Sequence, residues 1–156
     1  MSQLQMSRGR FPYKDLTTTI GSTYEAISAF SKSAHEHGLD KTLAELMKLR
    51  VSQINGCAFC AAIHLKFARA LGIDQTKLDL IAVWRESPVF SSSEKAALAW
   101  AEELARMPDG LPREALRDEL AAHFSQDQII GLTIAIASIS AWNRMAVTFG
   151  FSPADI

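Results

Sequence analysis

The residues of this chain whose types and spacing can do chemistry lie at positions 57–64. Cys57 and Cys60 are the only two cysteines, and His64 follows the second by four residues. A helix over 58–71 would bring these three side chains onto one face, because residues three, four and seven apart in a helix are neighbours. Two thiols that can close a disulfide, with a titratable base beside them, predict a redox site.

The expected chemistry is that of an activated thiol. A helix N-terminus and a neighbouring imidazole both lower a thiol pKa from about 8.5 toward neutrality. The thiolate can attack the O–O bond of a peroxide or the sulfur of a disulfide, and the second thiol then resolves the product. The spacing leaves open which thiol attacks. Cys60 is nearer His64, whereas Cys57 is nearer the helix end and is expected to be the more exposed.

Other interpretations of the motif fit less well. Haem attachment needs a histidine directly after the second cysteine, where this chain has Ala61. Structural zinc needs four ligands, of which the motif supplies three, and His35 or His37 would have to complete the set. Two small buried cysteines beside a core histidine are the purely structural alternative. We therefore expect no cofactor and no metal.

Composition and charge narrow the range of partners. The chain has 156 residues, with 16 Lys and Arg against 17 Asp and Glu, and no basic stripe that would indicate nucleic-acid binding. The longest uncharged run, 128–143, is short and contains polar residues, so it fits a buried helix better than a membrane span. The N-terminus lacks an apolar signal segment, so we expect a cytoplasmic protein. There a lone CxxC is more often catalytic or metal-binding than structural.

Capping signals predict an all-α domain of roughly seven helices. Capping boxes begin at Ser22, Ser91 and Ser125, Asp40 can cap another helix, and Pro112 suits a first helical position. With the apolar periodicity, these signals give helices over 22–38, 41–54, 58–71, 75–83, 92–106, 112–124 and 126–149.

Two further features concern domain organisation and assembly. Residues 1–20 have weak periodicity and are expected to form an N-terminal arm, with one domain over 21–156. The helix over 126–149 is apolar nearly all round, which is typical of a helix buried on every side. A domain of this size rarely encloses a whole helix, so we expect part of that surface to be an interface in a homo-oligomer.

The segment from Glu45 to His64 resembles the signature of the carboxymuconolactone decarboxylase family, in its AhpD-like alkylhydroperoxidase branch. That signature has a glutamate twelve residues before the first cysteine, then Ser52 and Asn55, then the CxxC pair and the histidine. The stretches 82–88 and 141–144 are also similar to this family, and the resemblance covers about residues 20–150.

The resemblance implies an all-helical fold that assembles as trimers or hexamers and acts as a thiol peroxidase. It implies that Cys60, the cysteine nearer His64, attacks the hydroperoxide, that Cys57 resolves the product, and that Glu45 and His64 form a proton relay. A small-molecule hydroperoxide and a dithiol electron donor would be the partners. The namesake peroxidase has a histidine where this chain has Phe59. The decarboxylase branch typically lacks the cysteine pair, which argues against a lyase.

The proton relay requires Glu45 to lie close to the CxxC motif in the folded chain. In one straight helix, Glu45 and Cys57 would lie about 18 Å apart at about 1.5 Å per residue. They can meet only if the chain folds back at Asn55-Gly56, a turn signal, in which case Glu45 and His64 become roughly level. A solvated surface position is the alternative for Glu45.

We therefore interpret the sequence as an antioxidant enzyme that reduces hydroperoxides through a dithiol–disulfide cycle. The alternatives are a general thiol–disulfide oxidoreductase, a decarboxylase-type lyase, and a non-catalytic redox-sensing or zinc-stabilised assembly. We expect Ser52 and Asn55 to brace the turn before the CxxC helix. Arg85 is expected to pair with a carboxylate at a subunit contact or to remain solvated.

Overall fold

The computed structural model describes residues 12–107 and 109–156, and within them the chain is helical with no strand. The all-α prediction is therefore confirmed for the described residues. Eight α-helices follow one another: α1 (Leu16–Thr19), α2 (Gly21–Ser33), α3 (Lys41–Ile54), α4 (Ala58–Ala70), α5 (Gln75–Leu80), α6 (Ser92–Arg106), α7 (Glu114–His123) and α8 (Gln126–Phe149). Short 3₁₀ turns add η2 (Tyr13–Asp15), η3 (Ala34–His37), η4 (Ile81–Val83) and η5 (Pro153–Asp155).

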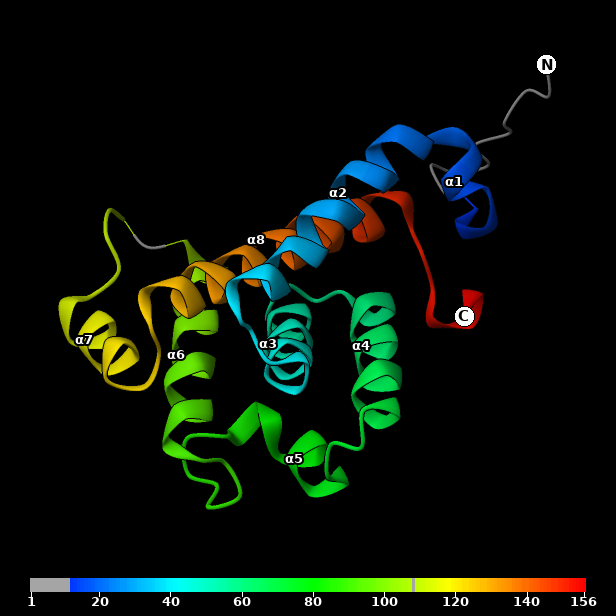
Figure 1. The fold of residues 1–156 in the computed structure, drawn as a ribbon. Helices are drawn as coiled ribbons and strands as arrows, with labels where there is room; N and C mark the ends of the chain where they lie inside the picture. Colours follow the sequence, from blue (N-terminus) through cyan, green and yellow to red (C-terminus); the bar gives the residue numbers. More distant parts are fainter. Residues whose placement is uncertain (1–11, 108) are drawn as a thin grey trace.

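The helix α3 lies at the centre of the fold. In Figure 1 it stands between α4 and α6, with α5 closing one end of this group and α2 and α8 crossing the other end. Buried residues of α3 enter both hydrophobic clusters: Met47 and Val51 pack with α6 and α8, and Leu46 and Leu49 pack toward α5 and η4. A side chain on α3 is therefore held from several directions.

Most of the predicted helix starts are confirmed by their caps. The Asp40 carboxylate accepts a hydrogen bond from the Leu43 N–H at the start of α3, and Ser91 and Ser125 form complete capping boxes at α6 and α8. Each cap satisfies backbone donors that the first helical turn leaves unpaired.

Two predicted starts are wrong. The helix α2 begins at Gly21 with Ile20 as its cap, one residue before Ser22, because α1 leads almost directly into it. The Ile20 N–H bonds the Leu16 carbonyl, and the Ile20 carbonyl accepts from Tyr24. The helix α7 begins at Glu114, so Pro112 lies before its cap rather than at its first helical position.

The segment predicted as an N-terminal arm is described only from residue 12, and positions 1–11 lie outside the described residues. Residues 13–19 form η2 and α1, and Leu16 is buried in the main cluster. The helix α1 is the one that raises the number of described helices from seven to eight. It has four residues, which is too short to leave an apolar period in the sequence.

The long helix α8 is apolar enough by composition to cross a membrane, with a mean hydropathy of 1.3 in its most apolar stretch. In the fold it packs against α2, α3 and α6, which is the arrangement of a core helix in a globular domain. One chain does not bury it completely, since Ile130 and Val147 remain 42% and 55% exposed. The oligomer interface expected on this helix therefore stays a prediction.

Candidate redox site

The site is built on the turn that joins α3 to α4. Asn55 ends α3, Gly56 has a φ of +68°, and Cys57 is the N-cap of α4. A positive φ is accessible to glycine at little cost, so Gly56 lets the chain reverse within two residues. The two helices lie side by side in Figure 1, as the predicted hairpin requires.

A polar residue of α8 holds this turn. The Asn55 side-chain amide donates to Asn143 Oδ1 at 2.9 Å, and the Asn143 amide donates to Ser52 Oγ at 3.1 Å. Ser52 Oγ also donates to the Lys48 carbonyl. The bracing role predicted for Ser52 and Asn55 is thus confirmed. Asn143 was missed as their partner, although an amide within an otherwise apolar helix was a signal for it.

The two cysteines form a disulfide with each other. Cys57 Sγ also accepts a hydrogen bond from the Cys60 N–H at 3.2 Å, as an N-cap side chain does. Both residues are buried, Cys57 at 2% exposure and Cys60 at 4%. The expectation that Cys57 is the more exposed is wrong, because its sulfur turns inward to cap α4.

Glu45 and His64 meet across the hairpin. His64 Nδ1 lies 2.7 Å from Glu45 Oε2, although the residues are nineteen apart in sequence. Both are buried, and Glu45 is 8% exposed, so the alternative of a solvated glutamate is excluded. Burial raises the pKa of the Glu45 carboxyl, but the hydrogen bond and charge of His64 and the charge of Lys48 outweigh it. The net result is a carboxyl pKa below its usual value, and therefore an ionised carboxylate.

The third polar side chain at this point is Lys48, one helical turn after Glu45. Its Nζ lies 3.4 Å from Glu45 Oε1, the oxygen that does not face His64. Lys48 is buried, at 8% exposure, which is rare for a lysine and is tolerated because a carboxylate is close. The carboxylate of Glu45 is thus shared between an ammonium and an imidazole.

A cavity of about 260 Å³ opens onto these groups. Cys60, His64, Glu45 and Lys48 all line it, whereas Cys57 does not. Most of the remaining wall is aromatic or aliphatic, and Ser28, Ser31 and Lys32 of α2 are its polar part. The apolar lining residues are Tyr13, Leu16, Tyr24, Phe59, Ile63, Phe67, Ile139, Trp142, Ala146 and Phe151. Of the two cysteines, only Cys60 is therefore in a position to contact a molecule in the cavity.

Phe59, between the two cysteines, holds one wall of the cavity in place. Its ring centre lies 4.8 Å from that of Tyr13 and 5.2 Å from that of Phe151, and those two rings lie 5.3 Å apart. These separations are typical of favourable aromatic pairs. Segments from the two ends of the described chain thus meet over the CxxC motif, and the position that carries a histidine in the namesake peroxidase serves packing here.

The two histidines considered for a zinc site make hydrogen bonds to groups other than the cysteines. His35 Nδ1 lies 3.0 Å from the Leu39 carbonyl, and His37 Nδ1 lies 2.6 Å from Asp127 Oδ1. Within residues 12–107 and 109–156, no three histidine, cysteine, aspartate or glutamate side chains are grouped as metal ligands. The structure does not bring His35 or His37 to the cysteines.

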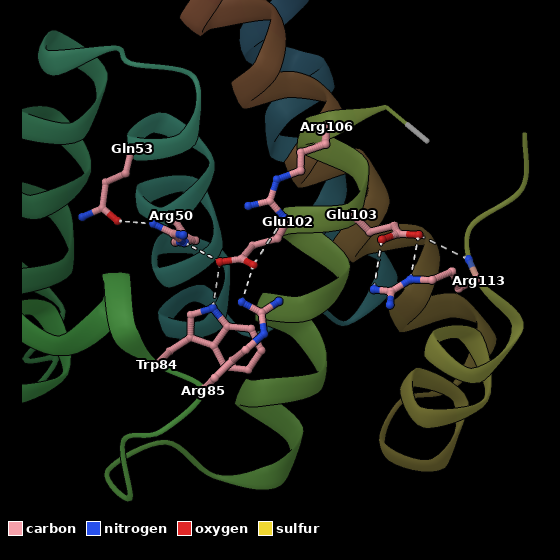
Figure 2. Close-up of polar contacts among 8 residues, drawn as sticks. All are labelled: Arg50, Gln53, Trp84, Arg85, Glu102, Glu103, Arg106 and Arg113. Atoms are coloured by element: carbon pink, nitrogen blue, oxygen red, sulfur yellow. Dashed lines mark hydrogen bonds and ion pairs between the residues drawn. The ribbon is translucent and has the colours of Figure 1, made fainter. Parts of the chain in front are cut away.

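A second buried carboxylate, which sequence reasoning missed, joins α3 to α6. The Glu102 carboxylate lies 2.7 Å from Arg50 Nε, 3.0 Å from Trp84 Nε1 and 2.6 Å from Arg85 Nη1. Figure 2 shows these side chains gathered around it. Arg85 therefore has its carboxylate partner within its own chain. Glu102 is 1% exposed. Burial raises the pKa of its carboxyl, but the hydrogen bonds from Trp84, Arg50 and Arg85 outweigh burial and leave that pKa below its usual value. This cluster supports α3 from the side away from α4 (Figure 1).

The chain is similar in sequence to known proteins. The model of the carboxymuconolactone decarboxylase family matches residues 22–103. The uncharacterized protein YdfG of Bacillus subtilis is 33% identical over 119 residues, which span 76% of this chain and 81% of that protein.

Two solved structures have the same fold. The first, a protein of unknown function from Agrobacterium tumefaciens described as a candidate antioxidant defence protein AhpD, has 34% identity and a TM-score of 0.84, over 93% of this chain and 97% of that one. The second, an AhpD-core, peroxidase-related protein from Ralstonia eutropha, has 22% identity and a TM-score of 0.77, over 88% and 73% of the two chains. The second likeness shows the fold alone.

Proposed function

The chain belongs to the carboxymuconolactone decarboxylase family, and from that premise we propose that it reduces organic hydroperoxides with the Cys57/Cys60 dithiol. One observation carries the proposal. Cys60 lines a largely apolar cavity together with His64, whose ring is hydrogen-bonded to the buried carboxylate of Glu45. A thiol, a base and an orienting carboxylate around one cavity form the usual arrangement of an activated nucleophile.

The first step is deprotonation of Cys60. A neutral imidazole that donates its Nδ1–H to Glu45 has Nε2 as an acceptor, and this nitrogen takes the thiol proton. The Glu45 carboxylate then stabilises the imidazolium. The N-terminus of α4, where Cys60 lies in the first turn, adds the positive end of the helix dipole and favours the thiolate.

The next two steps form the disulfide. The Cys60 thiolate attacks the terminal oxygen of the hydroperoxide, so that an S–O bond forms and the O–O bond breaks. The leaving alkoxide takes a proton from the His64 imidazolium and departs as an alcohol, which leaves Cys60 as a sulfenic acid. The Cys57 thiol attacks this sulfur, releases water and gives the Cys57–Cys60 disulfide of the structure. An external dithiol then reduces the disulfide and becomes oxidised itself.

The cavity wall supports an apolar organic hydroperoxide as the substrate. A pocket of about 260 Å³ lined mostly with aromatic and aliphatic side chains favours a substrate with an apolar body. Hydrogen peroxide has no apolar surface to bury there, so we expect the enzyme to prefer alkyl or aryl hydroperoxides over hydrogen peroxide.

Stopped-flow reaction of the reduced protein with several hydroperoxides tests the proposal. We expect rapid disulfide formation with cumene or tert-butyl hydroperoxide, and slower formation with hydrogen peroxide. A reduced protein that reacts no faster than free cysteine overturns the proposal. In that case, rapid exchange with small disulfides would favour a general thiol–disulfide oxidoreductase.

The cell context and assembly also belong to the proposal. We propose a cytoplasmic enzyme that works as a trimer or hexamer and takes its electrons from a dithiol donor. The exposed apolar side chains of α8, such as Ile130 and Val147, support an interface there.

A further inference from the structure

The buried ammonium of Lys48 has no part in the proton relay described above. It lies in the cavity wall with Cys60 and His64, and its one hydrogen-bond partner among the described residues is Glu45 Oε1. An ammonium has three N–H donors. Two donors therefore remain available for a molecule that occupies the cavity.

The register of the hairpin places Lys48 at the level of the reacting sulfur. Glu45 and His64 are in contact, which fixes how α3 and α4 pass each other. Toward the turn, Lys48 lies three residues beyond Glu45, and Cys60 lies four residues before His64. At the rise of a helix these steps are about 4.5 Å and about 6 Å, so the two residues are nearly level. Because residues three or four apart share a helix face, both look into the same cavity.

We propose that Lys48 is a further catalytic residue, whose ammonium donates a hydrogen bond to the peroxide oxygen that leaves as the alcohol. This inference rests on the proposed function. As the Cys60 sulfur bonds the terminal oxygen and the O–O bond breaks, negative charge develops on the inner oxygen. Lys48 stabilises that charge and keeps its own proton, while the proton that completes the alcohol comes from the His64 imidazolium. A donor held in place in a largely apolar cavity wall is effective at such a position.

The pairing with Glu45 also accounts for the burial of the Lys48 ammonium. The nearby carboxylate offsets the cost of removing an ammonium from water. At a separation of 3.4 Å the contact is long for a charge-assisted hydrogen bond. The ammonium is therefore able to donate to a second acceptor.

The test compares Lys48→Met and Lys48→Arg with the wild type in single-turnover reactions of the reduced protein. Methionine keeps the apolar stem without the charge, and arginine keeps donors. Lys66→Met, at an exposed position on α4 outside the cavity lining, is the matched control. We expect Lys48→Met to slow peroxide attack about 100-fold, the usual effect of removing one oxyanion donor. Lys48→Arg should recover part of the rate, and the control should match the wild type.

The distinguishing readout is the dependence of the rate on the leaving alcohol. Without Lys48, the charge on the leaving oxygen is uncompensated, so the rate across a series of alkyl hydroperoxides and a peracid should depend more steeply on the pKa of the leaving alcohol or carboxylic acid. Alkylation by iodoacetamide, measured where Cys60 is fully thiolate, should change little. Three results would overturn the inference and leave the proposed function standing. The rate could depend on the leaving-group pKa as it does in the wild type, or alkylation could slow as much as peroxide attack. The defect could also be confined to peroxides that carry a carboxylate. Failure of the wild type to react with any hydroperoxide overturns both.

Discussion

His64 Nδ1 lies 2.7 Å from Glu45 Oε2 in a buried contact across the α3–α4 hairpin. The contact occupies Nδ1, and in the proposed mechanism it leaves Nε2 as the ring nitrogen that takes the thiol proton. In that mechanism the carboxylate acts on the thiol only through the imidazole, so the two residues should give defects of different size.

Replacing His64 should raise the pKa of the attacking thiol and slow peroxide attack at neutral pH. General-base assistance is typically worth about 10²–10⁴-fold, and raising the pH should recover part of that loss because the thiolate then forms unaided. Glu45→Gln should give a smaller defect of the same kind. Rate against pH for His64→Ala and Glu45→Gln measures both effects, with His123→Ala on α7 as the control. If His64→Ala keeps the pH–rate profile of the wild type, His64 has only a packing role.

The two cysteines should give different products after one exposure to peroxide. Cys60→Ser should fail to react, because the remaining thiol does not line the cavity. Cys57→Ser should react once and stop at a sulfenic acid, which a dimedone-type reagent traps. Mass spectrometry of the wild type should show the loss of two hydrogens within one chain. If Cys57→Ser is the unreactive variant, the roles of the two thiols are exchanged.

Glu102→Gln should lower the free energy of unfolding at neutral pH by about 3 kcal/mol, since it leaves the largely buried Arg50 without its carboxylate. The pKa of this carboxyl is lowered in the folded protein. Its contribution is therefore complete above the unfolded pKa of about 4.3 and is lost as the pH falls through the lower folded pKa.

Urea unfolding of Glu102→Gln and the wild type between pH 3 and pH 7 measures this contribution. The difference between the two proteins should be constant above about pH 5 and should narrow in acid. Glu119→Gln, at an exposed position on α7, serves as the control. A difference that does not change with pH would show that the carboxylate charge is not what stabilises the fold.

Asn143→Ala should destabilise the protein by about 1–3 kcal/mol, because it removes the hydrogen bonds that a buried amide makes to Ser52 and to the half-buried Asn55. Thr148→Ala, on an exposed position of the same helix, controls for the change in α8 itself. Chemical denaturation of both variants gives the comparison. Equal stabilities would mean that the turn before the CxxC motif stands without help from α8.

Light scattering at micromolar concentration should show a trimer or hexamer. Ile130→Lys combined with Val147→Lys should shift the population toward smaller species, since both side chains are exposed and apolar in the single chain. A monomeric wild type would contradict the prediction, and an unaffected oligomer would place the interface on another face.

Local signals in the sequence were enough to predict seven of the eight described helices and the reactive motif. The Asp40 cap and the capping boxes at Ser91 and Ser125 each depend on residues within three positions, so they could be read without knowledge of the fold. The same holds for the CxxC spacing and for the turn at Gly56. Where one helix leads directly into another, as α1 does into α2, local signals misplaced the start of the second.

Only the tertiary structure decided which side chains surround the reactive sulfur. The hairpin turned the Glu45–His64 pairing from an expectation into a buried contact, and it brought Lys48 into the same wall. Glu102 and Asn143 gain their partners from helices far along the chain, and no local pattern specifies such contacts. The exposure of the two cysteines was misjudged for the same reason. Burial depends on which elements pack over a residue, and this is a property of the assembled fold rather than of the neighbouring sequence.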